Sequence, residues 1–133
     1  MKKLHMELFP MSLALICNKE EYVKFICSAH GVPDDYPLEG AGCAILVESD
    51  RGGIMTVVVL GDQVGRSPVH TLSVLAHEAT HAKQYLQRFI GEDLFGDETE
   101  AYLVGYFTCW LGQEYMKYAG KRNQAIKEKE NVN

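Results

Sequence analysis

Five consecutive residues in the middle of the chain combine two imidazoles with a carboxylate. They read His77-Glu78-Ala79-Thr80-His81, the pattern H-E-x-x-H. On an α-helix, residues four positions apart lie on one face, so both imidazoles can bind one metal ion. The Glu78 carboxylate lies beside the first histidine, where it can take a proton from a metal-bound water. The motif therefore predicts His77 and His81 as zinc ligands and Glu78 as a general base.

The motif lies in a segment whose pattern predicts a helix from Ser67 to about Ile90. Ser67 can cap this helix, Pro68 suits its first turn, and Gly91 is typical of a helix end. Apolar residues recur at helical spacing through the segment: Leu72, Leu75, Ala76, Ala79, Leu86 and Phe89. The alternative interpretation makes the motif residues polar side chains on a solvated helix face.

Upstream of this helix the pattern predicts a small sheet. Two runs rich in β-branched residues, Cys43–Val47 and Ile54–Leu60, are joined by a loop and predict a hairpin. The second run has no polar alternation, so we expect it to lie between two layers. Asn18 can cap a helix from residue 19 to about 30, and the apolar stretch 8–17 can be a strand or a helix.

Downstream, Asp97 can cap a last long helix that runs to about Tyr118, with Glu100 at the capping-box position. Gly120 predicts its end, which leaves residues 121–133 as a polar tail after a single domain over residues 1–120. Apolar residues lie almost all round this helix, so we expect it to be largely buried: Val104, Phe107, Trp110, Leu111 and Tyr115. The fold class is therefore α+β, with a small sheet and hairpin packed on the motif helix and a long C-terminal helix.

The composition limits the classes of protein to which this chain can belong. A chain of 133 residues with 47% hydrophobic content has room for one core, and its net charge of −5 argues against nucleic acid as the main partner. We find no export signal and no membrane-spanning run, so the expected compartment is the cytoplasm. The four cysteines form no C-x-x-C pair and are expected to be buried, reduced thiols, a disulfide being the alternative: Cys17, Cys27, Cys43 and Cys109.

A catalytic zinc usually has a third protein ligand. No histidine follows His81, and Gln84 and Gln87 occupy the positions where a longer H-E-x-x-H-x-x-G-x-x-H motif needs Gly and His. Upstream histidines are more often surface or structural residues: His5, His30 and His70. Cys109 lies among aromatic residues and is expected in the core. The remaining candidates are the acidic residues that follow the motif helix: Glu92, Asp93, Asp97, Glu98 and Glu100.

Over residues 67 to about 112 the chain resembles the gluzincin group of zinc metallopeptidases. In several gluzincin families the ligand Glu is followed by Ala three residues on and then by a polar residue. The segment Glu98-Thr99-Glu100-Ala101-Tyr102 fits this pattern with Glu98 as the ligand and Glu100 as the runner-up. Tyr102 stands where these families usually have Asp or Asn, so another group must orient a ligand histidine here. The resemblance implies a minimal zincin-like fold.

The resemblance also implies a zinc-dependent metallopeptidase in which Glu78 activates a Zn2+-bound water. We expect an oxyanion donor or supporting residue among Tyr102, Tyr106 and His70. A peptide or protein substrate could bind in extended form along an edge strand, with Ile54–Leu60 as the candidate and a central position for this all-apolar run as the alternative. We expect no nucleic-acid or membrane partner, and the oligomeric state stays open. The alternatives are a catalytically silent zinc-binding regulatory or interaction module of similar fold, and an accidental motif in a structural protein.

Overall fold

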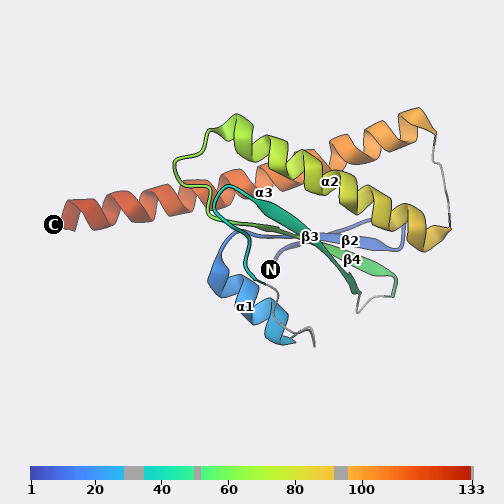
Figure 1. Ribbon diagram of the computed structural model, residues 1–133, viewed down its shortest axis with the longest axis horizontal. Coiled ribbons are helices and arrows are strands. Elements are labelled where there is room, and N and C mark those ends of the chain that lie inside the picture. Colours follow the sequence, from blue (N-terminus) through green and yellow to red (C-terminus); the bar gives the residue numbers. More distant parts are fainter. Residues whose placement is uncertain (29–34, 50–51, 92–95, 133) are drawn as a thin grey trace.

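A mixed sheet with helices on both of its faces forms the body of the protein in the computed structural model (Figure 1). The structure describes residues 1–28, 35–49, 52–91 and 96–132. Within them the strands lie in the order β1-β2-β4-β3: β1 (Lys3–His5), β2 (Met11–Ile16), β3 (Gly42–Glu48) and β4 (Ile54–Leu60). The helices are α1 (Lys19–Ser28), α2 (Pro68–Ile90) and α3 (Asp97–Val132). This arrangement confirms the predicted α+β class.

Strand β4 occupies the centre of the sheet. It pairs in parallel with β2 and antiparallel with β3, and all seven of its residues are buried. The prediction that this apolar run lies between two layers is therefore confirmed. The prediction that the same run is an edge strand for a peptide is wrong, because both of its edges are already paired. In the described sheet the edges belong to β3 and β1.

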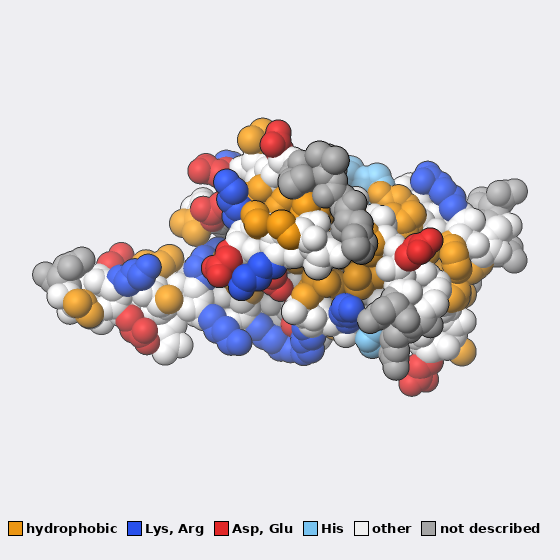
Figure 2. Space-filling view, turned by 90° about the horizontal axis from the view of Figure 1, so that it is seen from below, with side chains coloured by type: hydrophobic (Ala, Val, Ile, Leu, Met, Phe, Trp, Pro, Cys, Tyr) orange, Lys and Arg blue, Asp and Glu red, His pale blue; other side chains and the backbone are white. Residues whose placement is uncertain are grey.

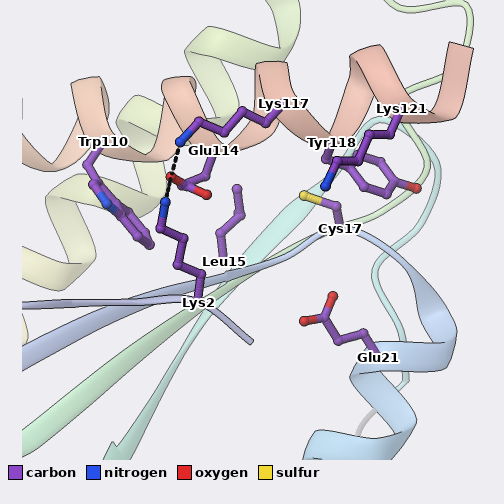
Figure 3. A pocket seen from close by; sticks show the side chains of 9 residues that line it. All are labelled: Lys2, Leu15, Cys17, Glu21, Trp110, Glu114, Lys117, Tyr118 and Lys121. Atoms are coloured by element: carbon purple, nitrogen blue, oxygen red, sulfur yellow. Dashed lines mark hydrogen bonds and ion pairs between the residues drawn. The ribbon is translucent and has the colours of Figure 1, made fainter. Parts of the chain in front are cut away.

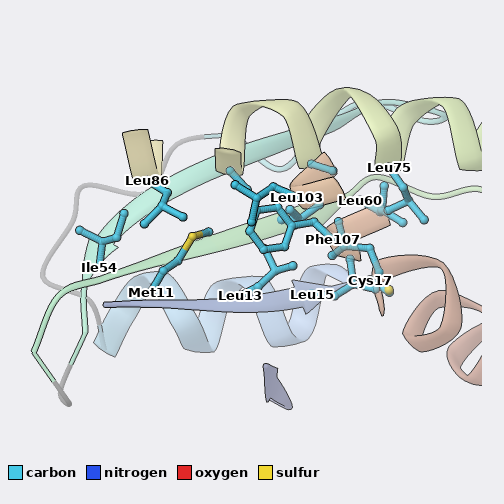
Figure 4. Packing of buried hydrophobic residues seen from close by; sticks show 14 residues of the cluster. Met11, Leu13, Leu15, Cys17, Ile54, Leu60, Leu75, Leu86, Leu103 and Phe107 are labelled. Atoms are coloured by element: carbon cyan, nitrogen blue, oxygen red, sulfur yellow. The ribbon is translucent and has the colours of Figure 1, made fainter. Parts of the chain in front are cut away.

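The apolar stretch over residues 8–17, whose sequence permits either a strand or a helix, contains strand β2. Its side chains alternate between the two faces of the sheet. Met11, Leu13 and Leu15 pack towards α2 and α3, around Phe107 (Figure 4). Ala14 and Ile16 join the second cluster, which α1 covers with Tyr22, Phe25 and Ile26. Burial on both faces explains why β2, like β4, shows no polar alternation.

Helix α2 has the bounds that its sequence predicts. The Ser67 hydroxyl accepts a hydrogen bond from the backbone N–H of His70 at 3.1 Å, and Gly91 ends the helix in the left-handed region with φ 77°. The predicted apolar stripe is buried at Leu75, Ala79 and Leu86. Its outer members, Leu72 and Phe89, are about half exposed because they lie at the margins of the buried face. The motif residues therefore sit in the middle of a well-defined helix.

Helix α3 runs unbroken through Gly120 to Val132, so the predicted helix end at that glycine is wrong. A glycine in a helix costs about 1 kcal/mol relative to alanine. The residues after it are mostly strong helix formers, and Gln124 donates to Glu128 at 3.2 Å across one turn. Figure 1 shows this last part of α3 projecting well beyond the sheet. The polar C-terminal segment is thus a helical extension within the described residues.

Only one stripe of α3 is buried, which corrects the expectation of a largely buried helix. Leu103, Phe107 and Leu111 recur every four residues and face the sheet and α2. Cys109 lies on another face and is exposed, so its expected place in the core is wrong. The reason is that α3 is packed on one side, and apolar residues elsewhere on its circumference meet solvent.

Cys17, Cys27 and Cys109 are free thiols, as expected, but the burial of the cysteines differs from the prediction. Cys17 is buried, Cys43 is half-buried, and Cys27 is exposed like Cys109.

Asp97 is the first residue of α3 and not its cap, since the Gly96 carbonyl precedes it and accepts from the N–H of Glu100 at 3.1 Å. No helix in the described part of the chain is long and apolar enough to cross a membrane.

Candidate metal centre

The two motif histidines converge on one point at the solvent side of α2. Their Nε2 atoms are 3.2 Å apart, and their rings meet edge to face with centroids 4.8 Å apart. Two zinc–nitrogen bonds of about 2.0–2.1 Å at a tetrahedral angle place the nitrogens about 3.3 Å apart. The separation of His77 and His81 therefore fits a shared metal ion.

Gln84 orients one of the two imidazoles. Its Oε1 lies 3.0 Å from Nδ1 of His81, one turn away on the same helix face. An amide oxygen can only accept, so Nδ1 carries the proton and Nε2 keeps a lone pair for a metal. Sequence reasoning missed this role, although the i, i+3 spacing of Gln84 and His81 was the signal for it. Gln84 thus orients a motif histidine. The sequence left this role unassigned because residue 102 is Tyr and not Asp or Asn.

The Glu78 side chain is buried beside the two histidines. It is 4% exposed, and its carboxylate has no hydrogen bond or ion pair among the described residues. Burial raises the pKa of this carboxyl group, while the neighbouring His77 and His81 act to lower it. A buried carboxylate beside two convergent imidazoles, with its pKa raised, suits a general base.

The histidine pair lies on the side of α2 that borders strand β3. The Tyr85 ring is nearly parallel to that of His81, with centroids 6.4 Å apart, and its hydroxyl donates to the Ala44 carbonyl of β3 at 3.3 Å. Nearer the start of α2, Val74 packs so closely on Gly42 that a β-carbon there would come within 2.8 Å of its side chain. The pair therefore lies near an edge strand.

Helix α3 packs on a different side of α2. Glu100 accepts a hydrogen bond from Gln87 at 2.7 Å and forms an ion pair with Lys83 at 3.8 Å. The helical repeat places these two partners about 120° around α2 from the histidine pair. The carboxylate of Glu100 is therefore engaged away from the imidazoles, and the predicted capping-box contact is replaced by contacts to α2.

Glu98 is exposed on the first turn of α3 and has no hydrogen bond or ion pair in the described part of the chain. Among the residues that the structure describes, no group of three or more His, Cys, Asp or Glu side chains is placed to hold a metal. Glu92 and Asp93 lie outside the described residues. The structure thus brings together His77, His81 and Glu78, and it leaves Glu98 and Glu100 apart from them.

The other predicted candidates have different neighbours. Nε2 of His70 lies 2.8 Å from the Gly40 carbonyl, and seven residues of helix, about 10 Å, separate it from His77. Nδ1 of His5 pairs with the Ser12 hydroxyl at 2.7 Å, and His30 lies outside the described residues. Tyr102 and Tyr106 are exposed and line a cavity with the loop that precedes β2. The described contacts place none of these residues beside the histidine pair.

Comparisons of the chain with protein-family models, with curated proteins and with solved structures found no match. The function of this site therefore has to be inferred from its own geometry. What the described residues offer is a pair of convergent imidazoles, a buried carboxylate beside them and an adjacent edge strand. This combination is suited to binding a divalent metal and moving a proton at a water molecule.

The buried carboxylate gives a test on stability. A raised pKa means that folding favours protonated Glu78. The stability that the protonated form contributes is therefore fully present below the ordinary carboxyl pKa, and it is lost as the pH rises through the raised pKa. We expect metal-free Glu78→Gln to be more stable than metal-free wild type at neutral pH, by on the order of 1 kcal/mol. The gain should vanish at about pH 3, where both side chains are neutral.

Urea denaturation of both proteins in EDTA, as a function of pH, measures this difference. Exposed Glu130 provides the matched control, because Glu130→Gln changes the same charge without a buried group. A Glu78→Gln protein that is less stable than wild type at neutral pH would contradict the prediction.

Proposed function

We propose that this chain is a zinc-dependent metallopeptidase. The proposal rests on the 3.2 Å separation of the Nε2 atoms of His77 and His81, with the buried carboxylate of Glu78 beside them. A bound Zn2+ would polarise the scissile carbonyl and lower the pKa of a bound water. The H-E-x-x-H resemblance supports the same chemistry.

Glu78 performs the proton transfers in this proposal. Its carboxylate takes a proton from the attacking water and returns it to the leaving amine nitrogen. Burial raises the pKa of Glu78, which makes its carboxylate a better proton acceptor. Gln84 keeps the His81 imidazole in the tautomer that offers Nε2 to the metal.

The substrate is an extended peptide in this proposal. Strand β3 replaces the central strand β4 as its binding edge, because one side of β3 is unpaired in the described sheet. Tyr85 connects β3 to the histidine side of α2 through its hydrogen bond to Ala44. A peptide added to this edge would run past the two imidazoles.

Glu98 is the proposed third ligand, with Glu100 as the competing residue. The Glu100 carboxylate is already held by Gln87 and Lys83, so recruiting it to a metal would break both contacts. The Glu98 carboxylate has no such contact among the described residues, so it can be recruited at lower cost. The first turn of α3 must approach the histidine side of α2 for either residue to bind the metal.

Metal analysis tests the ligand set. We expect wild type, loaded with zinc and then dialysed, to retain about one zinc per chain. Glu98→Gln should lose most of it, and Glu100→Gln should retain it. The opposite pattern would assign the ligand role to Glu100. A wild-type protein that takes up no zinc at neutral pH would contradict the proposed function itself.

A further inference from the structure

A second candidate site lies away from the histidine pair, between the start of the chain, the end of β2 and helix α3. Figure 3 shows this cavity, which has a volume of about 350 Å³. Three lysines line it, Lys2 from the N-terminal segment and Lys117 and Lys121 from α3. None of its lining residues comes from α2, so this cavity, which we call the lysine cavity, is separate from the candidate metal centre.

The lysine cavity carries an excess of positive charge in a chain whose net charge is −5. The ammonium groups of Lys2 and Lys117 both lie 3.1 Å from the same Oε1 atom of Glu114. The other lining carboxylate, Glu21, pairs with the N-terminal ammonium group at 3.8 Å. Lys121 has no carboxylate partner among the described residues, and Figure 3 shows its amine directed towards Cys17. The local charge therefore favours an anion.

Flat side chains form the walls of the lysine cavity. Trp110 and Tyr118 lie eight residues apart on one face of α3, and Leu15 of β2 lies between them at the floor (Figure 3). The guanidinium of Arg122, which does not line the cavity, lies 6.0 Å from the centroid of the Tyr118 ring. Figure 2 shows Lys and Arg side chains gathered along α3 where it leaves the body of the molecule.

We propose that the lysine cavity binds a small anion that carries an aromatic group, namely an aromatic phosphate or carboxylate. Lysine ammonium groups bind phosphate and carboxylate oxygens as point charges, with Lys121 available for this contact. Trp110 and Tyr118 provide ring faces for the apolar part of the ligand. The volume lies at the lower end of the range of small-molecule sites, which suits one ring with one anionic group.

Fluorescence tests this proposal directly, because Trp110 is the single tryptophan of the chain. Phenyl phosphate and benzoate serve as probes, with benzyl alcohol as the neutral ring and inorganic phosphate as the ring-free anion. We expect at least one aromatic anion to change the Trp110 emission saturably, and to bind more tightly than either partial compound. Lys121→Ala should weaken its binding roughly tenfold.

Lys129 is the matched control, since it is an exposed lysine on the same helix that does not line the cavity. Lys129→Ala should leave binding unchanged. The proposal is overturned if neither aromatic anion saturates the signal below about 10 mM. It is equally overturned if benzyl alcohol or inorganic phosphate binds as tightly, or if both lysine variants weaken binding alike. Zinc plays no part in these measurements, so the outcome is independent of the metal centre.

Discussion

Glu78→Gln is expected to abolish peptide hydrolysis while leaving zinc bound. Glutamine keeps the size of the side chain and cannot accept the proton of the attacking water. General-base catalysis contributes about a hundredfold or more to such reactions, so turnover should fall at least that far. The two imidazoles proposed as metal ligands are unchanged, and the buried position of residue 78 accepts a neutral side chain readily. Cleavage of an unfolded, fluorescently labelled casein by the zinc-loaded proteins measures the effect.

The control for this prediction is Glu130→Gln, which removes a carboxylate from the exposed end of α3 and should retain wild-type turnover. Undiminished hydrolysis by Glu78→Gln would remove the general-base role from this residue. A wild-type protein that binds zinc but cleaves no unfolded substrate would instead favour the silent zinc-binding module. The two outcomes are distinguishable because metal content and turnover are measured on the same samples.

His81→Ala is expected to lower zinc affinity by at least about a hundredfold, more than the loss of an orienting contact costs. The substitution removes one of the two Nε2 atoms that lie 3.2 Å apart and leaves His77 as an isolated imidazole. His81 is only partly buried, so the helix and the core beneath it should persist. Competition with a zinc-binding dye measures the affinity, and far-ultraviolet circular dichroism checks the fold.

Two further variants make this result specific. Gln84→Ala removes the acceptor for Nδ1 of His81 and should weaken zinc binding by about tenfold to a hundredfold. His5→Ala removes a histidine of β1 that pairs with Ser12 on the neighbouring strand β2, and it should leave zinc binding intact. Equal affinity in His81→Ala and wild type would exclude His81 from the ligand set.

Structural features that are set by residues close together in the chain can be predicted from this sequence. The Ser67 cap, the Gly91 end and the 3.6-residue apolar spacing determine α2, and that helix places His77 and His81 on one face. The continuous apolar run of β4 indicates a strand with both faces covered. The helix and its histidine pair arise from interactions within a few residues, and the apolar run of β4 is visible in the sequence itself, so local pattern is sufficient to predict these features.

Local pattern was insufficient for α3. Gly120 suggested a helix end, but the helix formers that follow it outweigh the cost of one glycine. The aromatic residues around α3 suggested a buried helix, yet Tyr102 and Cys109 are exposed because packing covers only one stripe. The position at which α3 meets the sheet and α2 determines which stripe is covered. The sequence of α3 alone does not specify that position.

The sequence by itself determined the histidine pair, the carboxylate beside it and the helix that holds them. Only the tertiary structure decided that β4 is central and β3 is an edge, and that Glu100 meets Lys83 and Gln87 on another side of α2. The reason is the range of the interactions. An i, i+4 pair is set by one turn of helix, whereas strand order and helix packing depend on how distant apolar surfaces are buried together.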